Sequence, residues 1–296
     1  LSNNHFFLHF GIGRAGTTFI QREIFNKIKG FKVINNNDEE MKLLLKIIDE
    51  NFSNIKDIDN LNNLFSRSKE KKIIISNETI CYKLVNYSKT DSFCKLFKKC
   101  NLLITIRSQI KILESLYIEV GNSNENKDEF FTFNEYISNC FNDIFHRNID
   151  KKFFESLNYF KLYNLFKQIS NKIEILPYEY LLNNHNEYIK ILNNFLEINI
   201  KKNLINFNSN PNKRKTKKWI FYEKFRTKIP VKRNFVTKYL SSYLQYKIKK
   251  FFMSGKRAEV KINKINMKKI NDYFNESNKK FEKISGINLQ SLNYYL

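Results

Sequence analysis

Residues 8–18 read Leu-His-Phe-Gly-Ile-Gly-Arg-Ala-Gly-Thr-Thr, an apolar run that passes into a glycine-rich turn and then into two hydroxyl residues. Gly11, Gly13 and Gly16 let a backbone turn tightly and bring its amide groups close to an anion. A helix that begins near Thr17 adds unpaired N–H groups and the positive end of its dipole. The stretch therefore predicts a strand, a phosphate-binding loop and a helix, in that order.

The loop lacks a residue that nucleotide triphosphatases use. Their motif, Gly-x4-Gly-Lys-Ser/Thr, aligns with residues 11–18 at both glycines and at the last threonine, but Thr17 stands at the lysine position. That lysine reaches the β and γ phosphates of a triphosphate, so its absence argues against ATP or GTP chemistry. The cation of this loop is Arg14, and the loop suits a single phosphoryl-type group. A strand-to-helix turn without any ligand stays open as an alternative.

A second apolar strand also ends in a charge. Residues 101–108 read Asn-Leu-Leu-Ile-Thr-Ile-Arg-Ser, and apolar residues at helical spacing follow them. Ligands of parallel α/β sheets bind outside the carboxyl ends of the strands, which is where Arg107 is expected. A guanidinium binds phosphate oxygens in bidentate fashion, and Ser115 offers a further donor. The alternative is a structural arginine at a strand end with an unrelated surface serine.

A third strand pattern, residues 71–76, places Glu78 at its carboxyl end. A carboxylate at that edge faces the crevice that Arg14 is expected to share. A positioned Glu that partial burial holds near the operating pH can take a proton from an acceptor hydroxyl. The alternative is a Glu that only caps the following helix or pairs with a lysine.

Together these segments resemble the sulfotransferases that use 3′-phosphoadenosine 5′-phosphosulfate (PAPS). Arg14 followed by x-Gly-Thr-Thr resembles their 5′-phosphosulfate loop, although most members have lysine at the Arg14 position. The spacing from Arg107 to Ser115 resembles their 3′-phosphate motif, and residues 178–181, Tyr-Glu-Tyr-Leu, resemble their Tyr-Glu-x-Leu element. The resemblance covers residues 5 to about 197 well and 267–293 loosely.

The resemblance implies PAPS as donor and 3′-phosphoadenosine 5′-phosphate (PAP) as product. The residues that it implies for the 5′-phosphate are Gly13, Arg14, Ala15, Gly16, Thr17 and Thr18. Arg107 and Ser115 would hold the 3′-phosphate, and Glu78 would act as base, as in several carbohydrate sulfotransferases. The implied acceptor is a hydroxyl or, less readily, an amine of a carbohydrate or similar molecule. Glu179 is expected to pair with a basic residue under the nucleotide site.

Histidines and cysteines give weaker signals. The four of each form no Cys-x-x-Cys or His-x3-His spacing, so we expect no metal site, and the sulfotransferases need none. His9 competes with Glu78 for the role of base, but a lone histidine in a strand is more often part of the core. Four cysteines without a disulfide framework suit a cytoplasmic protein.

The chain is strongly basic, with 52 Lys and Arg residues against 29 Asp and Glu and a net charge of +23. We interpret this charge as spread along the chain, with its densest run at residues 213–218. Lys213 and Arg214 are candidate contacts of a lid over the nucleotide, and a solvated charge run is the alternative. The diffuse charge argues against specific nucleic-acid binding. Two other functions stay open, a nucleotide kinase or triphosphatase with a degenerate loop and a non-enzymatic polyanion-binding protein.

We predict one α/β domain over residues 1–296, a parallel sheet with helices on both faces, with a less recognisable basic region at 201–265. Strands are expected at 5–11, 31–35, 72–77, 101–106 and from 172 onward. Helices are expected at 16–28, 38–50, 89–99, 109–120, 132–147, 153–169, 185–197, 219–226, 234–252 and 270–281. No apolar stretch of about 18 residues suggests a membrane span, and no signal peptide is visible.

Overall fold

The structure is a computed structural model, and it describes residues 4–86, 90–97, 100–121, 130–141, 151–170, 172–209, 215–226, 246–247 and 250–294. The chain separates into two compact units. The first unit comprises Leu1–Gln109, Glu155–Pro211 and Phe274–Leu296, and the second comprises Ile110–Phe154 and Asn212–Tyr273. A single domain over the whole chain stays a prediction.

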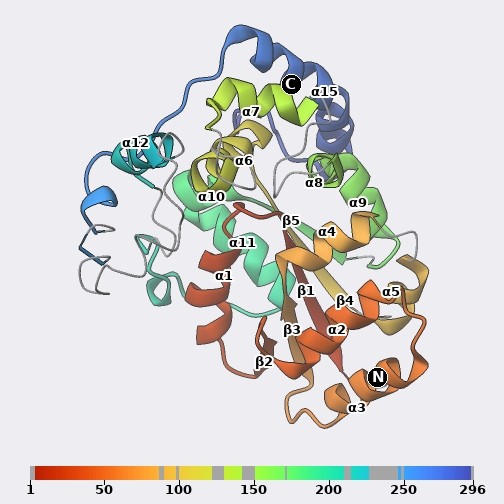
Figure 1. Cartoon of the computed structure of the whole chain (residues 1–296). Coiled ribbons are helices and arrows are strands. Elements are labelled where there is room, and N and C mark those ends of the chain that lie inside the picture. The colour runs from red at the N-terminus through yellow and green to blue at the C-terminus, as the bar shows by residue number, and fades with distance from the viewer. Residues whose placement is uncertain are drawn as a thin grey trace. The chain divides into compact units, whose positions relative to one another are not determined.

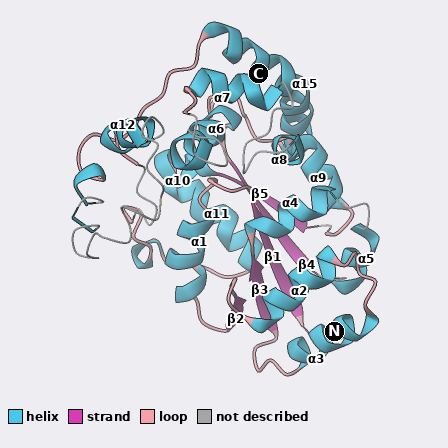
Figure 2. Ribbon diagram, in the orientation of Figure 1, coloured by secondary structure: helices cyan, strands magenta, loops and turns pink. Residues whose placement is uncertain are grey.

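The first unit is built on a parallel sheet of five strands in the order β2-β3-β1-β4-β5 (Figure 2). The strands are β1 (His5–Gly11), β2 (Phe31–Ile34), β3 (Lys72–Ser76), β4 (Cys100–Ile106) and β5 (Lys172–Pro177). After β1 the chain builds β2 and β3 on one side of it and then β4 and β5 on the other. The strand order thus reverses at β1, and such a reversal marks the ligand crevice of open α/β sheets.

Helices of the first unit cover both faces of its sheet (Figure 1). Those between β1 and β4 are α1 (Thr17–Glu23), the 3-10 helix η1 (Phe25–Lys27), α2 (Glu39–Asp49), α3 (Ile55–Ser66), α4 (Glu78–Asn86) and α5 (Thr90–Leu96). After β4 come α6 (Gln109–Leu116), the π-helix η2 (Tyr117–Gly121), α7 (Phe133–Phe141), α8 (Lys151–Ser156) and α9 (Tyr159–Lys167). After β5 come α10 (Tyr178–Asn183), α11 (His185–Leu196), the 3-10 helix η3 (Lys202–Leu204), α12 (Lys217–Arg226) and α15 (Lys264–Ser285).

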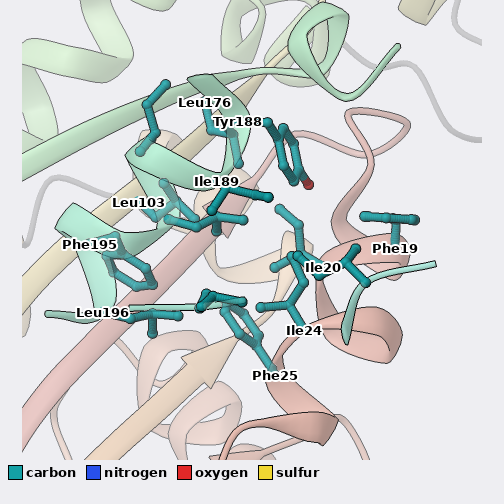
Figure 3. Close-up of a cluster of buried hydrophobic side chains, with 14 of the residues drawn as sticks. Phe19, Ile20, Ile24, Phe25, Leu103, Leu176, Tyr188, Ile189, Phe195 and Leu196 are labelled. Carbon is teal, nitrogen blue, oxygen red and sulfur yellow. The ribbon is translucent and has the colours of Figure 1, made fainter. Parts of the chain in front are cut away.

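One face of the sheet packs against α1 and α11. Phe7, Ile74, Leu103 and Leu176 point to this face from four different strands, and they meet apolar residues of both helices. Figure 3 shows this cluster, in which α1 contributes Phe19 and Ile20, its C-cap residue Ile24 joins them, and α11 contributes Tyr188, Ile189, Phe195 and Leu196. This buried layer fixes the end of β1 against the start of α1, which is where the glycine-rich loop lies.

The opposite face of the sheet carries an aromatic layer. Phe6 contacts the rings of Phe65 in α3 and of Phe97, with centroids 5.1 Å apart in each pair. Phe10 contacts Phe93 in α5 and Phe166 in α9. Because successive side chains of β1 point to opposite faces and both faces are buried, β1 is apolar at almost every position.

Several helices differ from the sequence prediction. The helix expected at 16–28 is divided into α1 and η1, and the one expected at 153–169 is divided into α8 and α9, where Asn158 caps α9. The helix α3 was not predicted. The helix expected at 89–99 is present as the shorter α5, and α4 before it is a further helix that the element prediction did not include. Much of the helix expected at 234–252 and residues 142–147 lie outside the described residues.

In the second unit, the Tyr117 hydroxyl donates a hydrogen bond of 2.8 Å to the carbonyl of Phe131, and its ring contacts Phe133 and Tyr136 of α7. Within the described part of the chain, no helix is both long and apolar enough to cross a membrane.

Candidate active site

The loop after β1 makes two left-handed turns. Arg14 has φ of 76° and Gly16 has φ of 89°. The Ala15 amide donates to the Ile12 carbonyl, and Gly16 precedes the first turn of α1, in which the Phe19 amide donates to the Gly16 carbonyl. A left-handed arginine is uncommon and costs free energy, and such conformations are concentrated at functional loops. The fold thus turns the backbone twice within three residues at the carboxyl end of β1.

Close approaches explain two glycines of this loop, Gly11 and Gly16. A Cβ atom added at Gly16 would lie 2.7 Å from Cδ2 of Tyr178, and one added at Gly11 would lie 2.3 Å from Oγ1 of Thr17. At Gly13 an added Cβ would lie 3.5 Å from Oε2 of Glu78, an ordinary van der Waals contact, so the loop passes close to that carboxylate at this glycine.

Glu78 lies beside the loop, as the sequence predicts. It is the first residue of α4, but the cap of that helix is Asn77, whose side-chain oxygen accepts from the amides of Thr79 and Ile80. The side chain of Glu78 is exposed, yet the protein atoms around its carboxyl raise its pKa by desolvation; the Thr17 hydroxyl and the charge of Arg14 oppose that rise. Glu78 is therefore an acidic group that does not cap α4 and lies within the electrostatic influence of Arg14.

Arg107 follows β4 directly and reaches the loop after β1. Its Nη1 donates a hydrogen bond of 2.9 Å to the carbonyl oxygen of Arg14, and its guanidinium lies 4.5 Å from the ring centroid of Tyr178. The structure therefore brings the side chain of Arg107, at the end of β4, to the backbone of Arg14 in the loop after β1.

A buried network holds the backbone around Arg107. The Ser108 amide donates to Oε1 of Glu179 at 3.0 Å, and the Tyr294 hydroxyl donates to Oε2 at 3.1 Å. The Tyr159 hydroxyl donates to the Arg107 carbonyl. Desolvation raises the pKa of Glu179, and the hydrogen bond from Ser108 opposes the rise. Glu179 accordingly accepts hydrogen bonds from an amide and a phenol, instead of pairing with a basic side chain as we expected.

Tyr159 and Tyr294 were not candidates at the sequence level. Tyr294 lies 115 residues from Glu179 in the chain, and no local pattern links them. The sequence signal for this network was the Tyr-Glu pair at 178–179. Tyr178 contacts the guanidinium of Arg107, and Glu179 accepts a hydrogen bond from the Ser108 amide.

His9 lies inside the sheet. It is fully buried, its Nδ1 is 2.8 Å from the Ser76 hydroxyl, and burial lowers its pKa to about 3. It therefore belongs to the core layer and lies below the strand ends that carry Arg14 and Arg107.

The other predicted residues have different outcomes. Thr17 is buried and Thr18 half-buried at the start of α1, and Ala15 is buried in the loop. Ser115 is half-buried in α6 of the second unit, so its relation to Arg107 stays a prediction. Lys213 and Arg214 lie outside the described residues. Among the residues that the structure describes, no cluster of His, Cys, Asp or Glu could hold a metal ion.

Comparison with known proteins identifies the fold. No protein-family model matches the sequence, and neither does any curated protein. Among solved structures, a sulfotransferase from Alicyclobacillus acidocaldarius is similar over 99% of both chains, with a TM-score of 0.54 and 10% identity. Mouse sulfotransferase SULT7A1, in complex with PAP, aligns with 68% of this chain and 60% of its own at a TM-score of 0.39 and 11% identity, which is too weak to support an argument.

The chain has the sulfotransferase fold, a five-stranded parallel sheet with helices on both faces. The predicted fold class and the resemblance in fold are thus confirmed. At 10% identity the likeness concerns the fold, and the chemistry has to be argued from this chain's own residues.

Proposed function

We propose that this protein is a sulfotransferase that moves the sulfuryl group of PAPS to a hydroxyl, or less readily an amine, of a carbohydrate or similar acceptor and releases PAP. The observation that carries the proposal is the contact of Arg107 with the backbone of Arg14. It supports two phosphate-directed cations at adjacent strand ends, as a 3′,5′-bisphosphate nucleotide requires.

The loop residues fit the 5′ end of this donor. The loop passes close to Glu78 at Gly13, and the backbone at Arg14 and Gly16 is already turned. Residues 13–18, Gly-Arg-Ala-Gly-Thr-Thr, would surround the 5′-phosphate with backbone amides and hydroxyls. Thr17 at the lysine position of triphosphatases leaves no cation for a γ-phosphate, which favours the phosphosulfate over ATP.

The 3′-phosphate belongs with Arg107. A guanidinium that already lies against the ring of Tyr178 loses little conformational freedom when it binds phosphate oxygens. Ser115 and the pair Lys213 and Arg214 remain proposed additional contacts of the nucleotide. The network through Glu179 would keep the Arg107 backbone in place while the guanidinium exchanges its bond to Arg14 for bonds to phosphate.

In the transfer step, Glu78 takes the proton of the acceptor hydroxyl. The oxygen of that hydroxyl forms a bond to the sulfur of PAPS at the same time. The bond from sulfur to the bridging oxygen breaks, and its electron pair stays on the 5′-phosphate. Arg14 offsets the negative charge that gathers there, and removal of one such group commonly costs about 3 to 4 kcal/mol in the transition state. The raised pKa of Glu78 makes it a better proton acceptor than an ordinary surface carboxylate.

To test the proposal, the protein is incubated with PAPS that carries a sulfur label and with a panel of acceptors, which are mono- and oligosaccharides, phenols and amines. We expect labelled product from a carbohydrate hydroxyl, with PAP released in equal amount, and no magnesium-dependent hydrolysis of ATP. ATP hydrolysis without sulfuryl transfer would favour the degenerate triphosphatase. Binding of polyanions without turnover of either nucleotide would favour the non-enzymatic protein. A cytoplasmic location belongs to the same proposal, because none of the four cysteines, all of which lie among the described residues, forms a disulfide.

A further inference from the structure

The net charge is concentrated in one segment, contrary to the interpretation that it is spread along the chain. Residues 212–273 contain 20 basic and 3 acidic side chains, a net charge of +17 out of +23. The rest of the chain contains 32 basic and 26 acidic side chains, a net charge of +6. A bias in amino-acid composition that acts on the whole chain would not deplete acidic residues in one segment of 62 residues alone. The charge of this segment therefore needs its own explanation.

The described part of this segment has a defined structure. Residues 215–217 pair with residues 256–258, through hydrogen bonds from the Lys217 amide to the Lys256 carbonyl at 3.1 Å and from the Ala258 amide to the Lys215 carbonyl at 2.9 Å. The rings of Tyr222 in α12 and Phe252 lie 4.6 Å apart. Helix α12 is thereby fixed against residues 251–258 of the same unit.

One face of α12 combines exposed lysines with an exposed aromatic ring, and Nζ of one of these lysines, Lys224, lies 5.8 Å from the ring centroid of Phe130. Lys217, Phe221 and Lys224 follow one another at helical spacing of four and three residues, so they share one face. Phe221 is 68% exposed, and both lysines are exposed. Lys218 lies three residues before Phe221, and its Nζ is 4.4 Å from the ring centroid of Phe251, itself 58% exposed. We call these five residues the α12 surface.

From the α12 surface we infer that the second unit docks on the surface of a bilayer that contains anionic phospholipid. Lysines at this spacing attract lipid phosphates, and their long stems allow the ammonium groups to stay at the headgroups. The rings of Phe221 and Phe251 enter the boundary between headgroups and acyl chains. A soluble polyanion would neutralise the lysines but would leave two large aromatic rings in water, which is why the exposed rings favour a lipid surface.

The protein carries its own reporter for this contact. Its single tryptophan, Trp219, is half-buried in α12, where its ring lies 5.8 Å from that of Tyr222 and 5.3 Å from Nζ of Lys215. Transfer of α12 to a lipid surface should shift the Trp219 emission to shorter wavelength. The full-length protein is titrated with vesicles of phosphatidylcholine alone and of phosphatidylcholine with 30 mol% phosphatidylglycerol, and sedimentation of the same samples gives the partition constant.

The α12 surface is tested with the triple variant Lys217→Gln, Lys218→Gln, Lys224→Gln. Each lysine should contribute a factor of about five to the partition constant, so the triple variant should lower this constant on anionic vesicles about 100-fold. The matched control replaces three exposed lysines of the first unit, Lys42, Lys56 and Lys69, by Gln and removes the same net charge. It should change the constant less than tenfold. A third variant, Phe221→Ser with Phe251→Ser, should weaken binding and abolish most of the emission shift.

The wild type should bind anionic vesicles, bind neutral ones poorly and lose affinity as salt rises. Three outcomes would overturn the inference. They are equal binding to both kinds of vesicle, an equal loss of affinity in the control and α12 variants, and unchanged binding after removal of both rings. So would tight binding of dextran sulfate together with no binding of vesicles, which would assign the surface to a soluble polyanion. These measurements need neither PAPS nor turnover, so their failure leaves the proposed transferase activity untouched.

Discussion

The guanidinium of Arg107 donates a hydrogen bond of 2.9 Å to the main-chain carbonyl of Arg14, so the ends of β4 and β1 are directly linked. The bond falls on the residue of the loop with φ of 76° and helps to hold that conformation. In the proposed function, one ligand would engage both residues. Binding at the 3′-phosphate would then affect the loop at the 5′ end.

Variants of Arg14 separate its charge from its backbone conformation. Arg14→Ala and Arg14→Gly should both lower kcat about 10²- to 10³-fold, because both remove the cation beside the leaving group. The glycine variant should be more stable than the alanine variant by about 1 kcal/mol, because only glycine adopts φ of 76° without strain. Turnover and urea unfolding measure the two effects. Arg14→Lys should recover most of the activity, and failure to do so would mean that the planar guanidinium itself is required.

The pH dependence follows from Glu78. The proposed base must be ionised, and its pKa is raised, so kcat/KM should fall as the pH drops through a value above the ordinary 4.5. Glu78→Gln should lower kcat about 10²- to 10⁴-fold and remove this acidic limb. The control is Glu39→Gln, at the first residue of α2, an exposed carboxylate at the equivalent place in another helix.

Stability gives an independent check on the same residue. A raised pKa in the folded state means that the protonated carboxyl favours folding, and this contribution is lost as the pH rises through the folded pKa. Glu78→Gln should therefore not lower the Tm at pH 7. A clear loss of Tm would show that the Glu78 carboxylate stabilises the fold, and the loss of activity could not then be assigned to the proton transfer.

Tyr294 should position Arg107 without touching the reacting atoms. Tyr294→Phe removes the hydrogen-bond donor to Oε2 of Glu179. Because a hydrogen bond to a charged group contributes about 1.5 to 3 kcal/mol, the variant should have a free energy of unfolding lower by about that amount. It should also have a higher KM for PAPS. We expect kcat to change less than threefold. Glu179→Gln can still accept from the Ser108 amide and should retain more PAPS affinity than Glu179→Ala. Tyr163→Phe is the control, and an equal effect there would contradict a specific role.

Two glycines with similar backbone angles isolate the tight contact in the loop. Gly16 has φ of 89° and meets Tyr178, whereas Gly30 has φ of 80° and nothing within 4 Å of an added Cβ atom. Gly30→Ala should cost about 1 to 2 kcal/mol of backbone strain. Gly16→Ala should cost more and should also weaken PAP binding, since Tyr178 must move. Thermal unfolding and calorimetry would contradict this account if both variants behaved alike.

The sequence predicted the sheet well because its central strands are short apolar runs that end at charged or polar residues, as at Arg107 and Glu78. It predicted the loop because glycine spacing restricts the backbone so strongly. The helix α3 was missed, although Asn54 at its N-cap and the spacing of Ile58, Leu61 and Phe65 were usable signals.

Contacts between distant segments could not be predicted. The bond from Tyr294 to Glu179 depends on how the C-terminal residues return to the sheet, and that path leaves no periodic signal in either segment. The left-handed conformation at Arg14 was equally invisible, because arginine rarely adopts it. The concentration of charge in residues 212–273 was visible in the sequence, but counting the whole chain together concealed it.

The central claim is that this chain holds a nucleotide by a 5′-phosphate at the Arg14 loop and a 3′-phosphate at Arg107. Calorimetric titration with PAP and with AMP, which lacks the 3′-phosphate, tests it most directly in the wild type and in Arg107→Ala. We predict that PAP binds the wild type about 100-fold more tightly than AMP, and that Arg107→Ala removes most of this difference while AMP affinity changes little. Equal affinities for PAP and AMP in the wild type, or a preference for PAP that survives in Arg107→Ala, would contradict the account.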